Sequence, residues 1–127
     1  MLNAYSDQIT TEKRLDDALL VQTITGRTDG VLVNTATAQL ADAVEKGGVS
    51  RVLMNVAKSD AVFTPAEFIA MFQGFTARFP QIRRVAYVLD PQTHDVQQML
   101  LEALAWNIGL DVFFAETLAE AETWIMR

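Results

Sequence analysis

Two kinds of apolar pattern alternate along the chain. Short and nearly continuous apolar runs predict buried strands, and they occur at residues 49–56, 84–89 and 111–115. Apolar residues recurring at three- and four-residue steps predict helices, and they occur over residues 29–46, over 64–79, from Asp90 to Gly109, and from Thr117 onward. Strands separated by helices in this way are typical of crossovers onto a parallel sheet.

The N-terminal part of the chain predicts an antiparallel pair. Residues 18–25 are rich in β-formers and stop at Gly26, and residues 9–15 precede them across Asp16 and Asp17. The chain is therefore expected to fold as one α/β domain over residues 1–127. This is a sandwich with a mostly parallel sheet of four or five strands, an antiparallel N-terminal edge and about four helices.

Turn and capping signals place the helix ends. Thr64-Pro65 followed by Glu67 predicts a capping box with proline at the first helical position, and Pro80 ends that helix. Asp90-Pro91 is expected to open the next helix, which Gly109 ends. The expected inward-facing side of that helix is Val96, Met99, Leu100, Ala103, Leu104 and Asn107, and that of the last helix is Leu118, Ala121, Trp124 and Ile125.

Composition excludes several kinds of chemistry. The chain has 127 residues, no Cys, one His and a net charge of −6. Without Cys there is no disulfide or thiol nucleophile, and a single His cannot supply a two-His metal site, so no metal or cofactor is expected. The negative charge argues against nucleic-acid partners, because phosphate binding depends on Lys and Arg.

No membrane or export signal is evident in the sequence. The first seven residues lack the basic start and apolar core of a signal peptide. The longest uncharged stretch, residues 30–41, is polar at several positions and too short for a span, which needs about 20 apolar residues. We therefore expect a cytoplasmic protein without a transmembrane segment.

The helix expected over residues 64–79 carries a stripe of phenylalanines. Phe68, Phe72, Phe75 and Phe79 follow one another at steps of four, three and four, with Phe63 just before the helix and Ile69 and Met71 beside the stripe. One interpretation is a helix face buried in the core. The other is a wide apolar surface that binds a ligand or a partner through Phe63, Phe68, Phe72, Phe75, Ile69 and Met71.

No catalytic constellation is apparent. His94 is expected to be an isolated surface histidine, and Ser6, Ser50 and Ser59 do not occur in a Gly-x-Ser-x-Gly motif. The segment 26–30 joins a strand to a helix but lacks the lysine of a phosphate loop, so it is interpreted as a turn. The sequence therefore predicts that the protein is not an enzyme.

Charge is distributed unevenly. Arg78, Arg83 and Arg84 form a local basic excess, whereas residues 90–126 contain seven acids and no Lys or Arg. Solvated faces account for most such runs. The alternative is a docking polarity in which the arginines of one molecule meet the acidic layer of another.

The segment 100–125 carries a family resemblance. It reads LLEALAWNIGLDVFFAETLAEAETWI, in which a helix closes on Asn-x-Gly, a short strand ends in Phe-Phe, and the last helix carries Glu-Ala-x-x-Trp. This resembles the end of bacterial STAS-like (SpoIIAA-like) proteins, and the order of elements agrees along nearly the whole chain. The resemblance implies a small α/β domain that acts by binding, often grouped with CRAL-TRIO-type lipid-binding folds.

The resemblance also implies a regulatory role. In regulatory STAS proteins, a Ser at a helix start within an Asp-Ser-Ser-Gly-like loop is phosphorylated to break a partner complex. Here that loop lacks the pattern, and Thr64 and Ser59 are the hydroxyl residues in its place. The first hypothesis is a non-enzymatic interaction module that binds itself as a homodimer or a protein partner. The second is a carrier or sensor of an apolar small molecule or lipid along residues 64–79.

Overall fold

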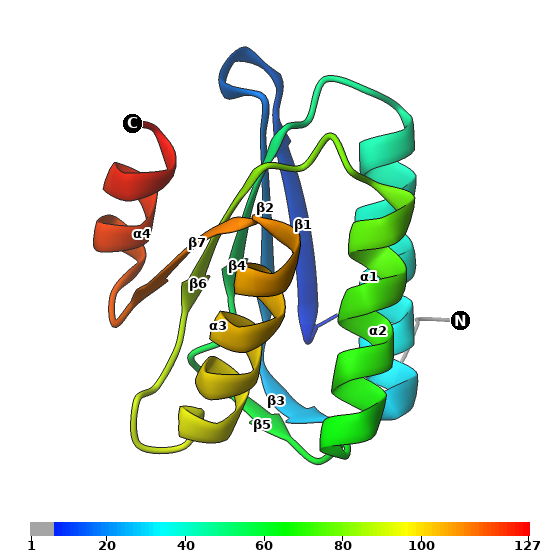
Figure 1. Cartoon of the computed structure of the whole chain (residues 1–127), viewed down its shortest axis with the longest axis vertical. Helices are drawn as coiled ribbons and strands as arrows, with labels where there is room; N and C mark the ends of the chain where they lie inside the picture. Colours follow the sequence, from blue (N-terminus) through cyan, green and yellow to red (C-terminus); the bar gives the residue numbers. More distant parts are fainter. Residues whose placement is uncertain (1–6) are drawn as a thin grey trace.

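The computed structural model describes residues 7–127, which form a five-stranded sheet with helices on both faces (Figure 1). In order across the sheet, the strands are β1 (Ile9–Arg14), β2 (Leu19–Ile24), β4 (Arg51–Asn55), β6 (Arg84–Val88) and β7 (Asp111–Ala115). β1 pairs antiparallel with β2, and the other neighbours are parallel. The predicted α/β class and the antiparallel N-terminal edge are confirmed.

Three helices cover one face of the sheet. α1 (Gly30–Glu45), α2 (Pro65–Arg78) and α3 (Asp95–Ile108) each join one parallel strand to the next. Every crossover steps across the sheet in the same direction, and right-handed crossovers of that kind place their helices on the same face. α4 (Leu118–Ile125) follows the edge strand β7 and lies on the opposite face (Figure 1).

Alternation along the strands divides the core into two layers. Leu20 of β2 and Val52 of β4 face α1 and α2, whereas their neighbours Leu19 and Leu53 face α4. On the α4 side, Ala121 and Ile125 are fully buried. Leu118, expected to face inward, is 39% exposed, because it is the first residue of α4 and lacks a preceding helical turn to cover it.

The predicted ends of α1 and α2 are confirmed. The Asp29 carboxylate accepts a hydrogen bond from the Leu32 amide at 2.8 Å and caps α1. Thr64 and Glu67 form the predicted capping box of α2, with each side chain accepting from the other residue's backbone amide.

Two expectations about loops are wrong. Residues 26–30 are not a simple turn, because β3 (Gly26–Thr28) pairs in parallel with β5 (Ser59–Ala61) as a second, two-stranded sheet. α3 does not begin at Asp90-Pro91 but at Asp95. The Asp90 carboxylate accepts from the Gln92 amide at 3.0 Å, which closes a turn instead of capping the helix.

Residues 1–6, on which the expected lack of an export signal depends, lie outside the described residues, so that expectation stays a prediction. Within residues 7–127, no helix is both long enough and apolar enough to cross a membrane.

Candidate functional site

The phenylalanine stripe of α2 faces the sheet. Phe68 and Phe72 are buried against Leu101 of α3, and Phe79 is buried in the layer beneath α1 and α2. Phe63 and Phe75 are only half-buried, and Ile69 and Met71 are half-buried as well. The stripe is therefore partly core and partly accessible, which neither of the two sequence interpretations described completely.

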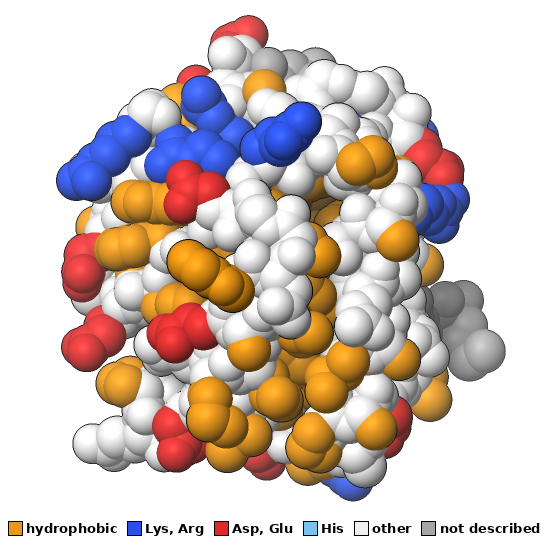
Figure 2. Space-filling view, viewed as in Figure 1, with side chains coloured by type: hydrophobic (Ala, Val, Ile, Leu, Met, Phe, Trp, Pro, Cys, Tyr) orange, Lys and Arg blue, Asp and Glu red, His pale blue; other side chains and the backbone are white. Residues whose placement is uncertain are grey.

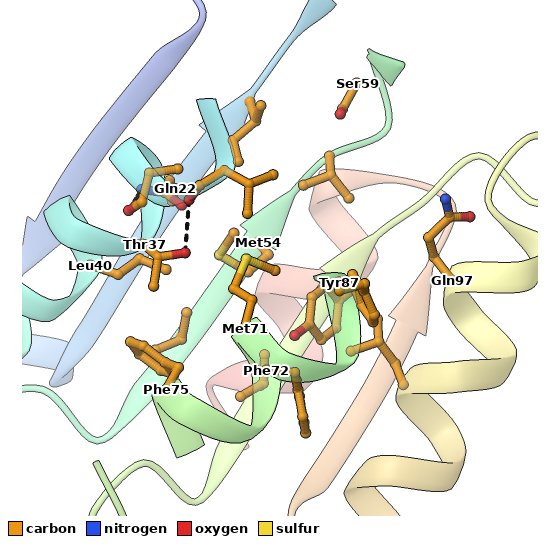
Figure 3. A pocket seen from close by; sticks show the side chains of 18 of the residues that line it. Gln22, Thr37, Leu40, Met54, Ser59, Met71, Phe72, Phe75, Tyr87 and Gln97 are labelled. Carbon is orange, nitrogen blue, oxygen red and sulfur yellow. Dashed lines mark hydrogen bonds between the residues drawn. The ribbon is translucent and has the colours of Figure 1, made fainter. Parts of the chain in front are cut away.

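Three of these half-buried residues, Phe63, Met71 and Phe75, border an apolar cavity of about 140 Å³ between the sheet and the three helices that cover this face (Figure 3). Five of the six predicted site residues line it: Phe63, Phe68, Met71, Phe72 and Phe75. Ile69 does not. The opposite walls come from β4, β6 and α1, which supply Met54, Tyr87 and Thr37. Hydrophobic atoms are visible between the ridges of α2 and α3 in Figure 2, so this layer is not fully covered.

A buried histidine closes one end of the cavity. His94 is 3% exposed, so the expectation of a surface histidine is wrong. Its Nδ1 accepts from the Asp90 amide at 3.0 Å, so the proton of the neutral ring lies on Nε2, which donates to the Ser59 carbonyl oxygen at 2.8 Å. Both ring nitrogens are thus occupied by backbone groups, and His94 has a positioning role instead of a catalytic geometry.

The two hydroxyl residues that the sequence offered as a switch, Thr64 and Ser59, are engaged in hydrogen bonds. Thr64 is exposed, and its Oγ1 caps α2 by accepting from the Glu67 amide at 3.2 Å. The Ser59 hydroxyl is half-buried and lies 2.6 Å from the Thr28 hydroxyl on β3. These contacts stabilise β5 and the start of α2, and a switch role for either hydroxyl stays a prediction.

The outer face of α3 carries a second apolar surface. The sequence predicted Val96, Met99, Ala103 and Asn107 to face inward, but all four are exposed, and the buried side is formed by Leu101 and Ala105. At about 100° per residue the two sides are nearly opposite. Val96, Met99, Ala103 and Trp106, spaced by three, four and three residues, are called the outer stripe below.

Exposure along the outer stripe is high. Val96 is 47%, Met99 61% and Trp106 86% exposed. Spacing of this kind is typical of a helix that packs against another helix. Asp95 and Glu102 flank the stripe on the same helix, and both are exposed.

Two of the three arginines of the basic excess identified in the sequence, Arg78 and Arg84, make contacts within the molecule. Arg78 pairs with Glu45 of α1, while Arg84 packs over the Trp124 ring at 4.1 Å and lies 3.4 Å from Asp111. Arg84 also donates to the Trp124 and Arg127 carbonyl oxygens at 3.1 and 2.6 Å. Lys and Arg side chains gather at the upper left of Figure 2, near the carboxyl end of α4.

Within residues 7–127, no group of three His, Asp or Glu side chains is arranged to hold a metal ion. The cavity and the outer stripe are therefore the two candidate sites considered below. Sequence reasoning found one side of the cavity and assigned three of the four residues of the outer stripe, Val96, Met99 and Ala103, to the core. Both sides of α3 are apolar, and the spacing of apolar residues alone does not tell which side faces the core.

Comparison with known proteins identifies the family. A family profile described as SpoIIAA-like matches residues 19–126, so the chain belongs to the SpoIIAA-like family. No curated protein matches the chain.

Solved structures show the same fold at low identity. An uncharacterised protein of Shewanella loihica with a SpoIIAA-like fold is 18% identical, with a TM-score of 0.65 over 92% of this chain and 91% of the other. An anti-sigma factor antagonist of Mycobacterium paratuberculosis is 16% identical, with a TM-score of 0.61 over 99% and 100%. The phosphorylated Bacillus cell fate determinant SpoIIAA is 17% identical, with a TM-score of 0.59 over 92% and 98%. The link to CRAL-TRIO folds is not shown by these matches.

Proposed function

We propose that this protein is a non-catalytic, regulatory interaction module and that it binds a protein partner through the outer stripe of α3. The observation that carries the proposal is the 86% exposure of Trp106 within a continuous apolar stripe on a helix whose core-facing side is already apolar. Large exposed apolar patches mark interaction sites, and tryptophan is enriched among the residues that dominate binding energy. Membership of the SpoIIAA-like family supports the proposal, since similar folds occur in proteins named as anti-sigma factor antagonists.

The charge beside the stripe indicates the chemistry of the partner. Asp95 and Glu102 flank it, and residues 90–126 contain seven acids and no Lys or Arg. A partner with an apolar helical face bordered by Lys or Arg would match both features.

A second copy of this chain matches less well. In an antiparallel pair of α3 helices, the two-fold axis would pass near the middle of the stripe. That arrangement places Glu102 beside its own copy, and like charges on facing helices destabilise a pair. The partner expected here is therefore a different protein.

Site-specific photocrosslinking tests this proposal. A p-benzoylphenylalanine in place of Met99, in the organism that makes the protein, is expected to give one adduct with another protein, on a segment that combines apolar and basic residues. The same group in place of Ala38, which is exposed on α1, is the matched control and is expected to give no such adduct. Adducts only between copies of this chain, or equal adducts from both positions, would contradict the proposal.

A second candidate function, a carrier or sensor of an apolar molecule, is favoured by the cavity. Its volume of about 140 Å³ is close to that of an engineered apolar cavity of about 150 Å³ that binds benzene. This volume favours a single-ring molecule over a lipid tail.

A further inference from the structure

Polar groups of the cavity wall for which no hydrogen-bond partner is found within residues 7–127 include Oε1 of Gln22, which is an acceptor, and the hydroxyl of Tyr87, which is a donor. Tyr87 lies on the central strand β6, and its ring stacks on Phe114 at 5.9 Å. Within residues 7–127, no hydrogen bond is found for the Tyr87 hydroxyl. Burial raises the pKa of this phenol, and no hydrogen bond contributes to the shift, so the hydroxyl stays protonated. Tyr87 is half-buried, and its hydroxyl is a donor in the cavity wall that a ligand's acceptor can meet.

The rest of the wall indicates what can supply that acceptor. Among residues 7–127, no Asp, Glu, Lys or Arg lines the cavity, and the ring nitrogens of His94 are both used by the backbone. A charged ligand would lose its hydration without gaining an ion pair, which is costly. The ligand is therefore expected to be uncharged.

The shape of the wall favours a flat ring. Phe63 and Phe68 stack at a centroid distance of 5.8 Å, and the side chains of Met54, from β4, and Met71, from α2, both line the space. Aromatic faces and methionine sulfur both pack well against an aromatic ring. Figure 3 shows the Tyr87 hydroxyl on the side of Met71 and Phe72, which cover the cavity from α2.

We propose that the cavity binds an uncharged, single-ring aromatic molecule whose carbonyl oxygen accepts a hydrogen bond from the Tyr87 hydroxyl. This inference rests on the second candidate function, the carrier or sensor, and is independent of the outer stripe. It adds to that function the chemical class of the ligand and the residue that selects it.

A matched pair of probes tests the inference. Acetophenone and α-methylstyrene have nearly the same shape, but only acetophenone has a carbonyl oxygen. Each is titrated into the protein while the methyl NMR signals of Met54 and Met71 are followed, with benzoate as a charged control. Acetophenone is expected to bind about 2- to 10-fold more tightly than α-methylstyrene, the range for one net hydrogen bond, and benzoate is expected not to bind.

Variants separate the possible causes. Tyr87→Phe is expected to remove the preference for acetophenone and to leave the affinity for α-methylstyrene unchanged. Thr37→Phe places a ring in the cavity and is expected to abolish binding of both. Thr35→Phe is its control, because Thr35 donates to the i−4 carbonyl of α1 as Thr37 does but does not line the cavity.

The outcomes distinguish the role of Tyr87 from the carrier function itself. Equal affinity for the two probes in the parent protein, with binding that Thr37→Phe abolishes, would overturn the role of Tyr87 and keep the carrier function. Absence of binding by either probe, or binding that survives Thr37→Phe, would overturn both.

Discussion

Nε2 of His94 donates a hydrogen bond to the carbonyl oxygen of Ser59 at 2.8 Å and so ties the loop after β6 to the short strand β5. The ring's other nitrogen accepts from the Asp90 amide within that loop. Ser59 in turn meets Thr28 of β3 through their hydroxyls. The His94 imidazole therefore links the loop after β6 to β5, and β5 in turn is linked to β3 through Ser59.

Replacing this histidine should cost stability. His94→Phe keeps a buried ring but leaves the Asp90 amide and the Ser59 carbonyl without their partner. Each unsatisfied buried group costs about 1–3 kcal/mol, so the free energy of unfolding should fall by about 2–6 kcal/mol in urea titration. Thr93→Phe, at an exposed neighbouring position, should change it by less than about 0.5 kcal/mol. Similar losses in the two variants would contradict a specific role for His94.

Arg84 should hold α4 against the sheet. Its guanidinium donates to carbonyl oxygens at the end of that helix and covers Trp124. Arg84→Lys keeps the charge but loses the planar fork, so the amides of α4 should exchange with solvent at least several-fold faster in a hydrogen-exchange experiment. Arg83→Lys, at the exposed neighbour, should leave their exchange unchanged. Equal exchange in both variants would show that α4 is held by apolar contacts alone.

Stability should fall at alkaline pH because of Tyr87. The pKa of this phenol is raised in the folded protein, whereas in the unfolded chain it is about 10. The stability that the neutral phenol contributes is fully present below pH 10 and is lost as the pH rises through the folded pKa, because the unfolded state releases its proton first. The free energy of unfolding measured from pH 9 to 11 should therefore decline more steeply in the parent than in Tyr87→Phe. Parallel curves would contradict the raised pKa.

Sequence patterns predicted where the main helices and strands lie better than they predicted which segments pair and which side chains are buried. α1 and α2 begin where Asp29 and Thr64 cap them, and these caps depend only on residues close by in the sequence. β3 and β5 are short and lie far apart in the chain, and they pair through contacts such as Thr28 with Ser59. No local pattern encodes such a pair.

The cavity and the outer stripe were only half predictable for the same reason. The spacing of Phe68, Phe72 and Phe75 located one wall of the cavity, but Tyr87 reaches the same space through the order of strands in the sheet. On α3, both Met99 and Leu101 are apolar, and only the position of the sheet decides that Leu101 is the buried one. The outer stripe therefore became visible only in the folded chain.

The most direct test of the central claim concerns Trp106. The affinity for the partner captured from position 99 is measured by titration with the parent protein and with Trp106→Gln, together with the free energy of unfolding of each. Trp106 is 86% exposed, so the substitution should leave stability within about 0.5 kcal/mol of the parent. A residue central to binding typically contributes about 2 kcal/mol or more, so affinity should fall by about 30-fold or more. Unchanged affinity at unchanged stability would show that the outer stripe of α3 is not the binding surface.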